Sequence, residues 1–190
     1  MSNDSLLTAE EFAATRHELP DGGRWTELVA GRPVLISPPS VEHGNAVLNL
    51  GKALAEYSQK GQGGYACFEL GFTIARNPDT VLFPAACFFT IGAMFAESDK
   101  TVTESRPAVI VEVASSNDRR RGLDDRIGGW LNWGVSVVWL LDPHAKRVHV
   151  FEKGCPGQPL AEHESLTGQS VLSGFQTNVG NLFKEPGWYK

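Results

Sequence analysis

Residues 107–113 have the sequence Pro-Ala-Val-Ile-Val-Glu-Val, and this stretch decides the class of fold. A run of apolar, mostly β-branched residues is typical of a strand buried on both faces at the centre of a sheet. Glu112 interrupts the run, and an ionisable side chain there is costly to bury unless it is paired, bound to a metal or shifted in pKa. The stretch therefore predicts a central strand with a candidate site near its end.

The segments that follow predict a parallel βαβ unit. Apolar residues recur at helical spacing over residues 118–133, and Gly134 is placed to close that helix. Residues 135–141 are again almost purely apolar, which predicts a second buried strand. Two such strands joined by a helix favour parallel pairing.

The C-terminal part predicts a hairpin and a set of short elements. A turn at residues 142–146 leads into the alternating residues 147–152, so the sheet continues as a hairpin. Beyond it we expect short strands near residues 160–164 and 170–172 and a final helix over residues 179–183.

The N-terminal half predicts two helices and two strand pairs. Thr8-Ala9-Glu10-Glu11 is a capping box, and Ala30-Gly31 suits a tight turn. The expected elements are a helix from Thr8, a hairpin of residues 24–29 and 32–36, a helix over residues 41–59, and an antiparallel pair of residues 65–75 and 81–90. Together they predict an α/β fold, a mixed β-sheet flanked by helices, in one domain over residues 1–190.

Composition excludes several classes of protein. The chain of 190 residues has a formal charge of −5, so any nucleic-acid contact must come from a local patch. Cys67, Cys87 and Cys155 are odd in number and lack CxxC spacing, which indicates neither a disulfide framework nor a zinc site. The N-terminal segment is polar and no apolar run approaches the ~20 residues of a membrane span, so we expect a cytoplasmic protein without membrane contact.

Five stretches in order carry a resemblance to a known family. They are Glu27-Leu28-Val29-Ala30-Gly31, Ser37-Pro38-Pro39, His43, Val109-Ile110-Val111-Glu112-Val113-Ala114-Ser115, and Val138-Trp139-Leu140-Leu141-Asp142-Pro143. Over about residues 7–183 the chain resembles the Uma-type restriction endonucleases, a large bacterial family. The resemblance implies a restriction-endonuclease-like fold of the PD-(D/E)xK nuclease class.

The same resemblance implies a metal-dependent site. In such nucleases an aspartate after a proline and a glutamate on the next central strand hold Mg²⁺, and a lysine, here on the following helix, helps to activate water or stabilise charge. Glu112 matches the glutamate, Glu27 matches a further family position, and Arg126 falls where the lysine is expected. The resemblance thus implies Glu112, Arg126 and Glu27 as catalytic residues, with Glu112 and Glu27 as metal ligands.

Two departures put cleavage in doubt. The Pro-Asp pair is Pro84-Ala85 here, and a methyl group cannot bind Mg²⁺. Arg126 keeps a positive charge but is effectively never deprotonated, so it can clamp a phosphate yet cannot act as a base. Asp79 could substitute for the missing aspartate, although a turn residue making local hydrogen bonds is the favoured interpretation. Ala85 could also be an engineered change, against which the second departure, Arg126, argues.

A cluster of basic residues follows the central strand. Arg119, Arg120 and Arg121, with His43, are candidate nucleic-acid contacts at the same end as Glu112. A solvated loop balanced by aspartates is an equal alternative for the arginines, and a histidine at the core margin is the favoured one for His43. The tryptophans, by contrast, are expected in the core rather than on a base-stacking platform.

Two functions remain open from the sequence. The first is a metal-dependent DNA endonuclease, weakened or inactive, with Mg²⁺ as its cofactor if it is active and none otherwise. The second is a catalytically dead relative that acts as a nucleic-acid-binding or protein-interaction module. For Glu112 the structural alternative is an ion pair with Arg119, Arg120 or Arg126. DNA is the expected partner, and a homodimer would suit the cutting of two strands.

Overall fold

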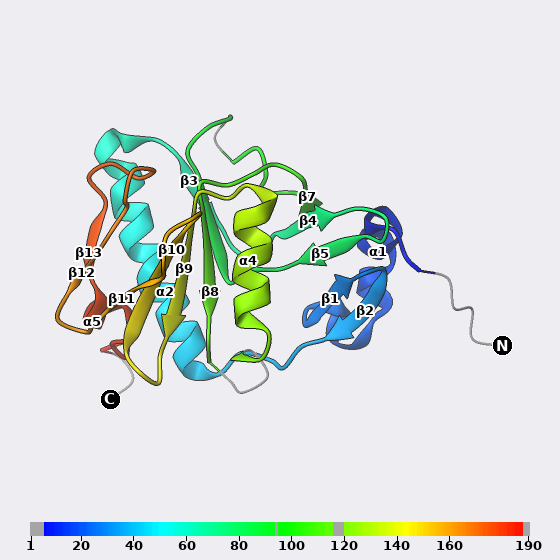
Figure 1. Cartoon of the computed structure of the whole chain (residues 1–190), viewed down its shortest axis with the longest axis horizontal. Coiled ribbons are helices and arrows are strands. Elements are labelled where there is room, and N and C mark those ends of the chain that lie inside the picture. Colours follow the sequence, from blue (N-terminus) through cyan, green and yellow to red (C-terminus); the bar gives the residue numbers. More distant parts are fainter. Residues whose placement is uncertain (1–5, 94, 116–119, 188–190) are drawn as a thin grey trace.

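The computed structural model describes residues 6–93, 95–115 and 120–187. A six-stranded sheet, in the order β11-β10-β9-β8-β6-β3, lies between helix α2 (Val41–Tyr57) and helix α4 (Leu123–Trp133) (Figure 1). Its strands are β3 (Tyr65–Cys67), β6 (Ala86–Phe89), β8 (Val109–Val113), β9 (Val137–Asp142), β10 (Arg147–Glu152) and β11 (Gln158–Leu160). The predicted α/β class, with a mixed sheet flanked by helices, is confirmed.

Strand β8 is the central strand that its sequence predicts. It pairs antiparallel with β6 and parallel with β9, and α4 joins β8 to β9 as expected. Its side chains point alternately to the two faces of the sheet. Val109, Val111 and Val113 join the core beneath α2, whereas Ile110 joins the core beneath α4. Glu112 shares the face of Ile110. The carboxylate of Glu112 is therefore directed toward α4.

A second, five-stranded sheet lies beside the first, in the order β2-β1-β5-β4-β7 (Figure 1). Its strands are β1 (Thr26–Val29), β2 (Arg32–Leu35), β4 (Gly71–Ala75), β5 (Thr80–Leu82) and β7 (Val102–Thr103). The predicted hairpin of β1 and β2 is confirmed, with Ala30 and Gly31 both at positive φ. Strand β7 has only two residues, which explains why no pattern predicts it.

The expected pairing of residues 65–75 with 81–90 is divided between the two sheets. Strand β4 pairs with β5 in one sheet, whereas β3 pairs with β6 in the other. Between the halves, Glu69 takes a positive φ, and Pro84 lacks the N–H that a continuous ladder would need. Both segments therefore change sheets at these residues, which brings the ends of β1, β6 and β8 close together.

The helices and the C-terminal strands complete the fold. Helix α1 (Ala9–Thr15) begins at the predicted capping box, whose two reciprocal hydrogen bonds are present. The other elements are the short helices η1 (Arg16–Glu18), η2 (Pro20–Gly23) and η3 (Ser58–Gln62), the hairpin β12 (Ser165–Thr167) and β13 (Gln176–Asn178), and α5 (Val179–Leu182). None of the helices in the described part of the chain is long and apolar enough to cross a membrane. All three cysteines are free.

The strand boundaries predicted for the C-terminal region are wrong. Residues 170–172 lie between β12 and β13 in a turn, where the Leu172 N–H donates to Gly168 O at 2.9 Å. Leu172 is fully buried, so its apolar character serves packing rather than a β-ladder.

Asp79 ties helix α1 to the turn between β4 and β5. Its carboxylate accepts hydrogen bonds from Ala9 N at 2.8 Å, Asn77 N at 3.1 Å and Arg76 Nη1 at 2.8 Å. The Ala9 N–H and its other donors hold the pKa of Asp79 below its usual value. The buried carboxylate is thus a structural cap for α1, and its oxygens are directed at these donors.

The variant Asp79→Asn is expected to lower the free energy of unfolding by about 1–3 kcal/mol at pH 7, since at least one buried donor loses its acceptor. A depressed pKa contributes stability that is present above the unfolded pKa and is lost as pH falls through the folded one. The deficit should therefore shrink when urea unfolding is repeated near pH 3. A deficit that grows in acid would contradict this role.

Candidate functional site

Glu112, Glu27 and Arg126 meet at one place, although they come from three different elements. Glu112 lies on β8 of the six-stranded sheet, and Glu27 lies on β1 of the five-stranded sheet. Arg126 lies on α4, which covers the face of β8 that carries Glu112. The residues that the sequence predicts as a site are thus brought together where the two sheets adjoin.

The guanidinium of Arg126 bridges both carboxylates. Its Nη1 and Nη2 donate to Glu27 Oε2 and Oε1 at 2.7 and 2.8 Å, which is a bidentate ion pair. Its Nε donates to Glu112 Oε1 at 2.6 Å, and Nη2 also reaches Phe83 O at 3.2 Å. The ion pair of Glu112 with an arginine, one of the alternatives left open by the sequence, is therefore present. A lysine could not reproduce this planar arrangement of donors.

Two further donors complete the polar contacts of the carboxylates. Trp130 Nε1 donates to Glu112 Oε1 at 2.7 Å, and Phe83 N donates to Glu27 Oε1 at 2.7 Å. Trp130 lies four residues after Arg126 on α4, so both side chains reach Glu112 from the same helix face. Trp130 is not among the site residues that the sequence predicts, although its i, i+4 spacing from Arg126 indicates a shared helix face.

Burial makes this cluster electrostatically coupled. The side chains of Glu27 and Glu112 are 4% and 7% exposed, whereas that of Arg126 is 20% exposed. Burial raises the pKa of Glu112, since desolvation outweighs the attraction of Arg126, and the charge of Glu27 adds to the rise. Burial alone would lower the pKa of Arg126, but Glu112 and Glu27 hold it above its usual value. The arginine is therefore a permanent cation between two acidic groups.

The residues of this site do not fit a divalent cation. Mg²⁺ takes oxygen ligands that converge on one point, and here both oxygens of Glu27 and Oε1 of Glu112 already accept from N–H donors. Arg126 occupies the position between the carboxylates that a cation would need. Within residues 6–93, 95–115 and 120–187, no cluster of three or more histidine, cysteine, aspartate or glutamate side chains could hold a metal ion.

Ala85 lies next to Glu112 along the paired strands but adds no ligand. Its N–H donates to Val111 O at 3.0 Å, and its side chain packs against the core beneath α2. Asp79, the conceivable substitute, directs its carboxylate to the start of α1 instead. Neither residue supplies a third carboxylate to the pair formed by Glu27 and Glu112.

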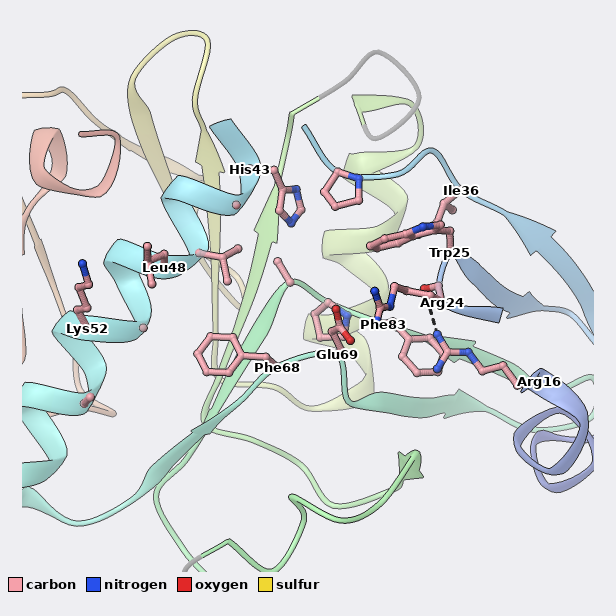
Figure 2. Close-up of a pocket in the computed structure, with 17 residues that line it drawn as sticks. Arg16, Arg24, Trp25, Ile36, His43, Leu48, Lys52, Phe68, Glu69 and Phe83 are labelled. Atoms are coloured by element: carbon pink, nitrogen blue, oxygen red, sulfur yellow. Dashed lines mark hydrogen bonds between the residues drawn. The ribbon is translucent and has the colours of Figure 1, made fainter. Parts of the chain in front are cut away.

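Two hollows lie beside the site. One, of about 620 Å³, is lined by Glu27, Glu112 and Arg126 together with Arg121. The other, of about 660 Å³, has Ala85 and His43 among its lining residues and is shown in Figure 2.

The candidate nucleic-acid contacts have different surroundings. His43 is buried and its Nδ1 lies 3.1 Å from Ser115 Oγ, which agrees with its expected place at the core margin. Arg120 forms a bidentate ion pair with Asp142 at 2.7 and 2.9 Å, while Arg121 lines the hollow of the site. Arg119 lies outside the described residues. A role of these side chains in binding nucleic acid stays a prediction.

The comparisons with known proteins agree with this fold. Among proteins with curated descriptions, none matches the chain. Among solved structures, the chain is similar to a crystal structure described as "a putative nuclease belonging to DUF820" from Anabaena variabilis ATCC 29413. That match has a TM-score of 0.75 and 18% identity, and it covers 93% of this chain and 97% of the other. The profile of the Uma2 family, described as "Putative restriction endonuclease", matches residues 9–180. This chain therefore belongs to the Uma2 family.

Proposed function

We propose that this chain is a restriction-endonuclease-like protein that binds DNA but has lost, or retains only weakly, metal-dependent phosphodiester cleavage. The observation that carries the proposal is the guanidinium of Arg126 held between Glu27 and Glu112. The family and the fold supply the nuclease class.

The chemistry of the site supports loss of cleavage. A metal ion in such a site lowers the pKa of the attacking water and offsets charge on the phosphate. Arg126 keeps a positive charge, but it cannot accept a proton, and its N–H groups are directed at Glu27, Glu112 and Phe83 O. Two carboxylates and one guanidinium leave a net negative site, which disfavours a phosphate there. The binding of DNA therefore has to come from groups around the cluster of Glu27, Glu112 and Arg126.

Cleavage assays on matched variants test the proposal. With Mg²⁺ or Mn²⁺, the wild type is expected to cut plasmid and single-stranded DNA no faster than a Glu112→Gln control. The double variant Ala85→Asp/Arg126→Lys should gain metal-dependent cleavage, because it restores a carboxylate and frees Glu27 and Glu112 from the guanidinium. The single variants Ala85→Asp and Arg126→Lys separate the contributions of the two positions to cleavage.

A measurement of metal binding accompanies the assays. Millimolar Mn²⁺ is expected to leave the melting temperature of the wild type unchanged and to raise that of the double variant, because a ligand stabilises only a folded state that binds it. Metal-dependent cleavage by the wild type that disappears in Glu112→Gln would show an active nuclease and overturn the proposal.

A further inference from the structure

The second hollow contains a set of cations in a chain that is acidic overall. Arg16 and Arg24 line one side of it and Lys52, on α2, lines the other (Figure 2). In the described part of the chain, no carboxylate lies within ion-pair distance of any of the three, although Glu69 and Glu27 attract Arg16 from farther away. The protein carries a formal charge of −5, so unpaired cations around one hollow are a local departure from its general character. Such a departure favours an anionic ligand.

The walls between these cations are aromatic. Trp25, Phe68 and Phe83 line the hollow, and Phe68 is 46% exposed although it is a large apolar side chain. Its ring lies against α2 at Gly51, where an added Cβ would come within 3.1 Å of Phe68 Cζ. Gly44, on the same helix, faces open space. The hollow is thus partly lined by aromatic rings. Its volume of about 660 Å³ lies within the range of ~300–1,000 Å³ usual for small-ligand sites.

Arg16 is both one of the cations of the hollow and in contact with one of its aromatic rings. Its guanidinium carbon lies 3.7 Å from the centroid of the Phe83 ring, and its Nη2 donates to Arg24 O at 3.1 Å. Its Nε is buried and has no hydrogen-bond partner among the described residues. Stacked guanidinium and aromatic faces beside further cations are a combination that suits a nucleobase attached to a phosphate.

We infer that this hollow binds an unstacked nucleotide of single-stranded DNA, with its base against Phe68 and Trp25 and its phosphates near Lys52 and Arg24. The inference rests on the proposed function and names its substrate class. Glu69, also in the hollow, provides an acceptor for amino groups on a base edge. Ala85 lines the same hollow, so a strand bound there would run past the former catalytic position. A duplex would not fit in this way, since its bases are stacked and paired.

Fluorescence anisotropy with a labelled 12-nucleotide strand and the same strand in a duplex tests the inference. The single strand should bind at least about 10-fold more tightly, and Phe68→Ala should weaken its binding roughly 5- to 100-fold, as expected for one lost base stack. Lys52→Ala should reduce the slope of log affinity against log salt by about 0.7. The matched controls are Phe95→Ala, at a phenylalanine that is 58% exposed, and Lys153→Ala, at an exposed lysine, and both should bind as the wild type does.

The outcomes distinguish this inference from the proposed function. Equal affinity for strand and duplex, or equal effects of Phe68→Ala and Phe95→Ala, would overturn the nucleotide hollow while leaving DNA binding intact. Binding of neither strand nor duplex would defeat both. Free deoxyadenosine monophosphate serves as a competitor: if it binds as tightly as the strand and depends on Phe68, the occupant is a free nucleotide and the assignment to a strand is wrong.

Discussion

Replacing Arg126 by methionine is expected to lower the free energy of unfolding by roughly 3–5 kcal/mol at pH 7, because a buried pair that loses one partner leaves an uncompensated charge. Here two carboxylates lose their partner at once, since Arg126 donates to both Glu27 and Glu112. Methionine keeps much of the volume of the side chain, so the loss reports charge and hydrogen bonding more than packing. Urea unfolding of the two proteins measures it.

The pH dependence of this deficit has a definite sign. Without the guanidinium, burial and the charge of Glu27 would raise the pKa of Glu112 further than burial raises it in the wild type. A raised pKa contributes stability that is present below the unfolded value, about 4.3 for glutamate, and is lost as pH rises through the folded value. The deficit of Arg126→Met should therefore shrink between pH 7 and about pH 5.

Arg120→Met is the matched control. Arg120 also forms a bidentate pair, with Asp142, but its side chain is 35% exposed. Because this pair is more exposed and only one carboxylate loses its partner, Arg120→Met should cost clearly less than Arg126→Met. Comparable losses in Arg120→Met and Arg126→Met, or a deficit of Arg126→Met that grows in acid, would contradict the buried-cation account of Arg126.

Much of the fold follows from the sequence because its signals are local. The apolar run around Glu112 predicts the central strand, and the capping box at Thr8 and the close at Gly134 predict helix ends. The passage of residues 65–75 and 81–90 from one sheet to the other is not local. It depends on the positive φ of Glu69 and on the break at Pro84, whose consequences are decided by which strands lie nearby.

The candidate site shows the same division. A carboxylate in a buried apolar strand needs a partner, so the sequence context alone makes Glu112 a candidate site residue. The resemblance adds Glu27 and Arg126. The sequence could not decide between a metal and an arginine as that partner, because the choice depends on distances of a few ångströms between three elements. Trp25 shows a related limit: Trp130 and Trp139 lie in the core as expected, whereas Trp25 is half-buried and lines a hollow.

Trp130 is expected to be the second large contributor to stability. It is fully buried, its ring centroid lies 5.8 Å from that of Phe72 and 6.1 Å from that of Trp133, and Arg126 Cζ lies 5.9 Å from its centroid. Trp130→Ala should therefore cost roughly 3–5 kcal/mol through lost packing and the cavity left behind. Chemical denaturation at pH 7 provides the measurement.

Trp130→Phe separates the hydrogen bond from the packing. A smaller aromatic ring is kept, but Glu112 loses the donor at 2.7 Å, for which we expect a loss of about 1–3 kcal/mol beyond the cost of the smaller ring. Trp139→Phe is the matched control, because Trp139 is equally buried and its Nε1 has no hydrogen-bond partner in the described part of the chain. That change leaves a similar cavity but removes an unsatisfied donor, so it should cost less than Trp130→Phe by about 1–3 kcal/mol. Equal losses in the two variants would show that the indole N–H of Trp130 does not stabilise the carboxylate.

The two variants should also differ in acid. Since the Trp130 N–H lowers the pKa of Glu112 against the effect of burial, its removal lets that pKa rise further. Protonation of Glu112 then relieves the loss, so the deficit of Trp130→Phe should diminish as pH falls toward about 5, while that of Trp139→Phe stays constant. A deficit of Trp130→Phe that does not depend on pH would mean that Arg126 alone holds the charge of Glu112 in the fold.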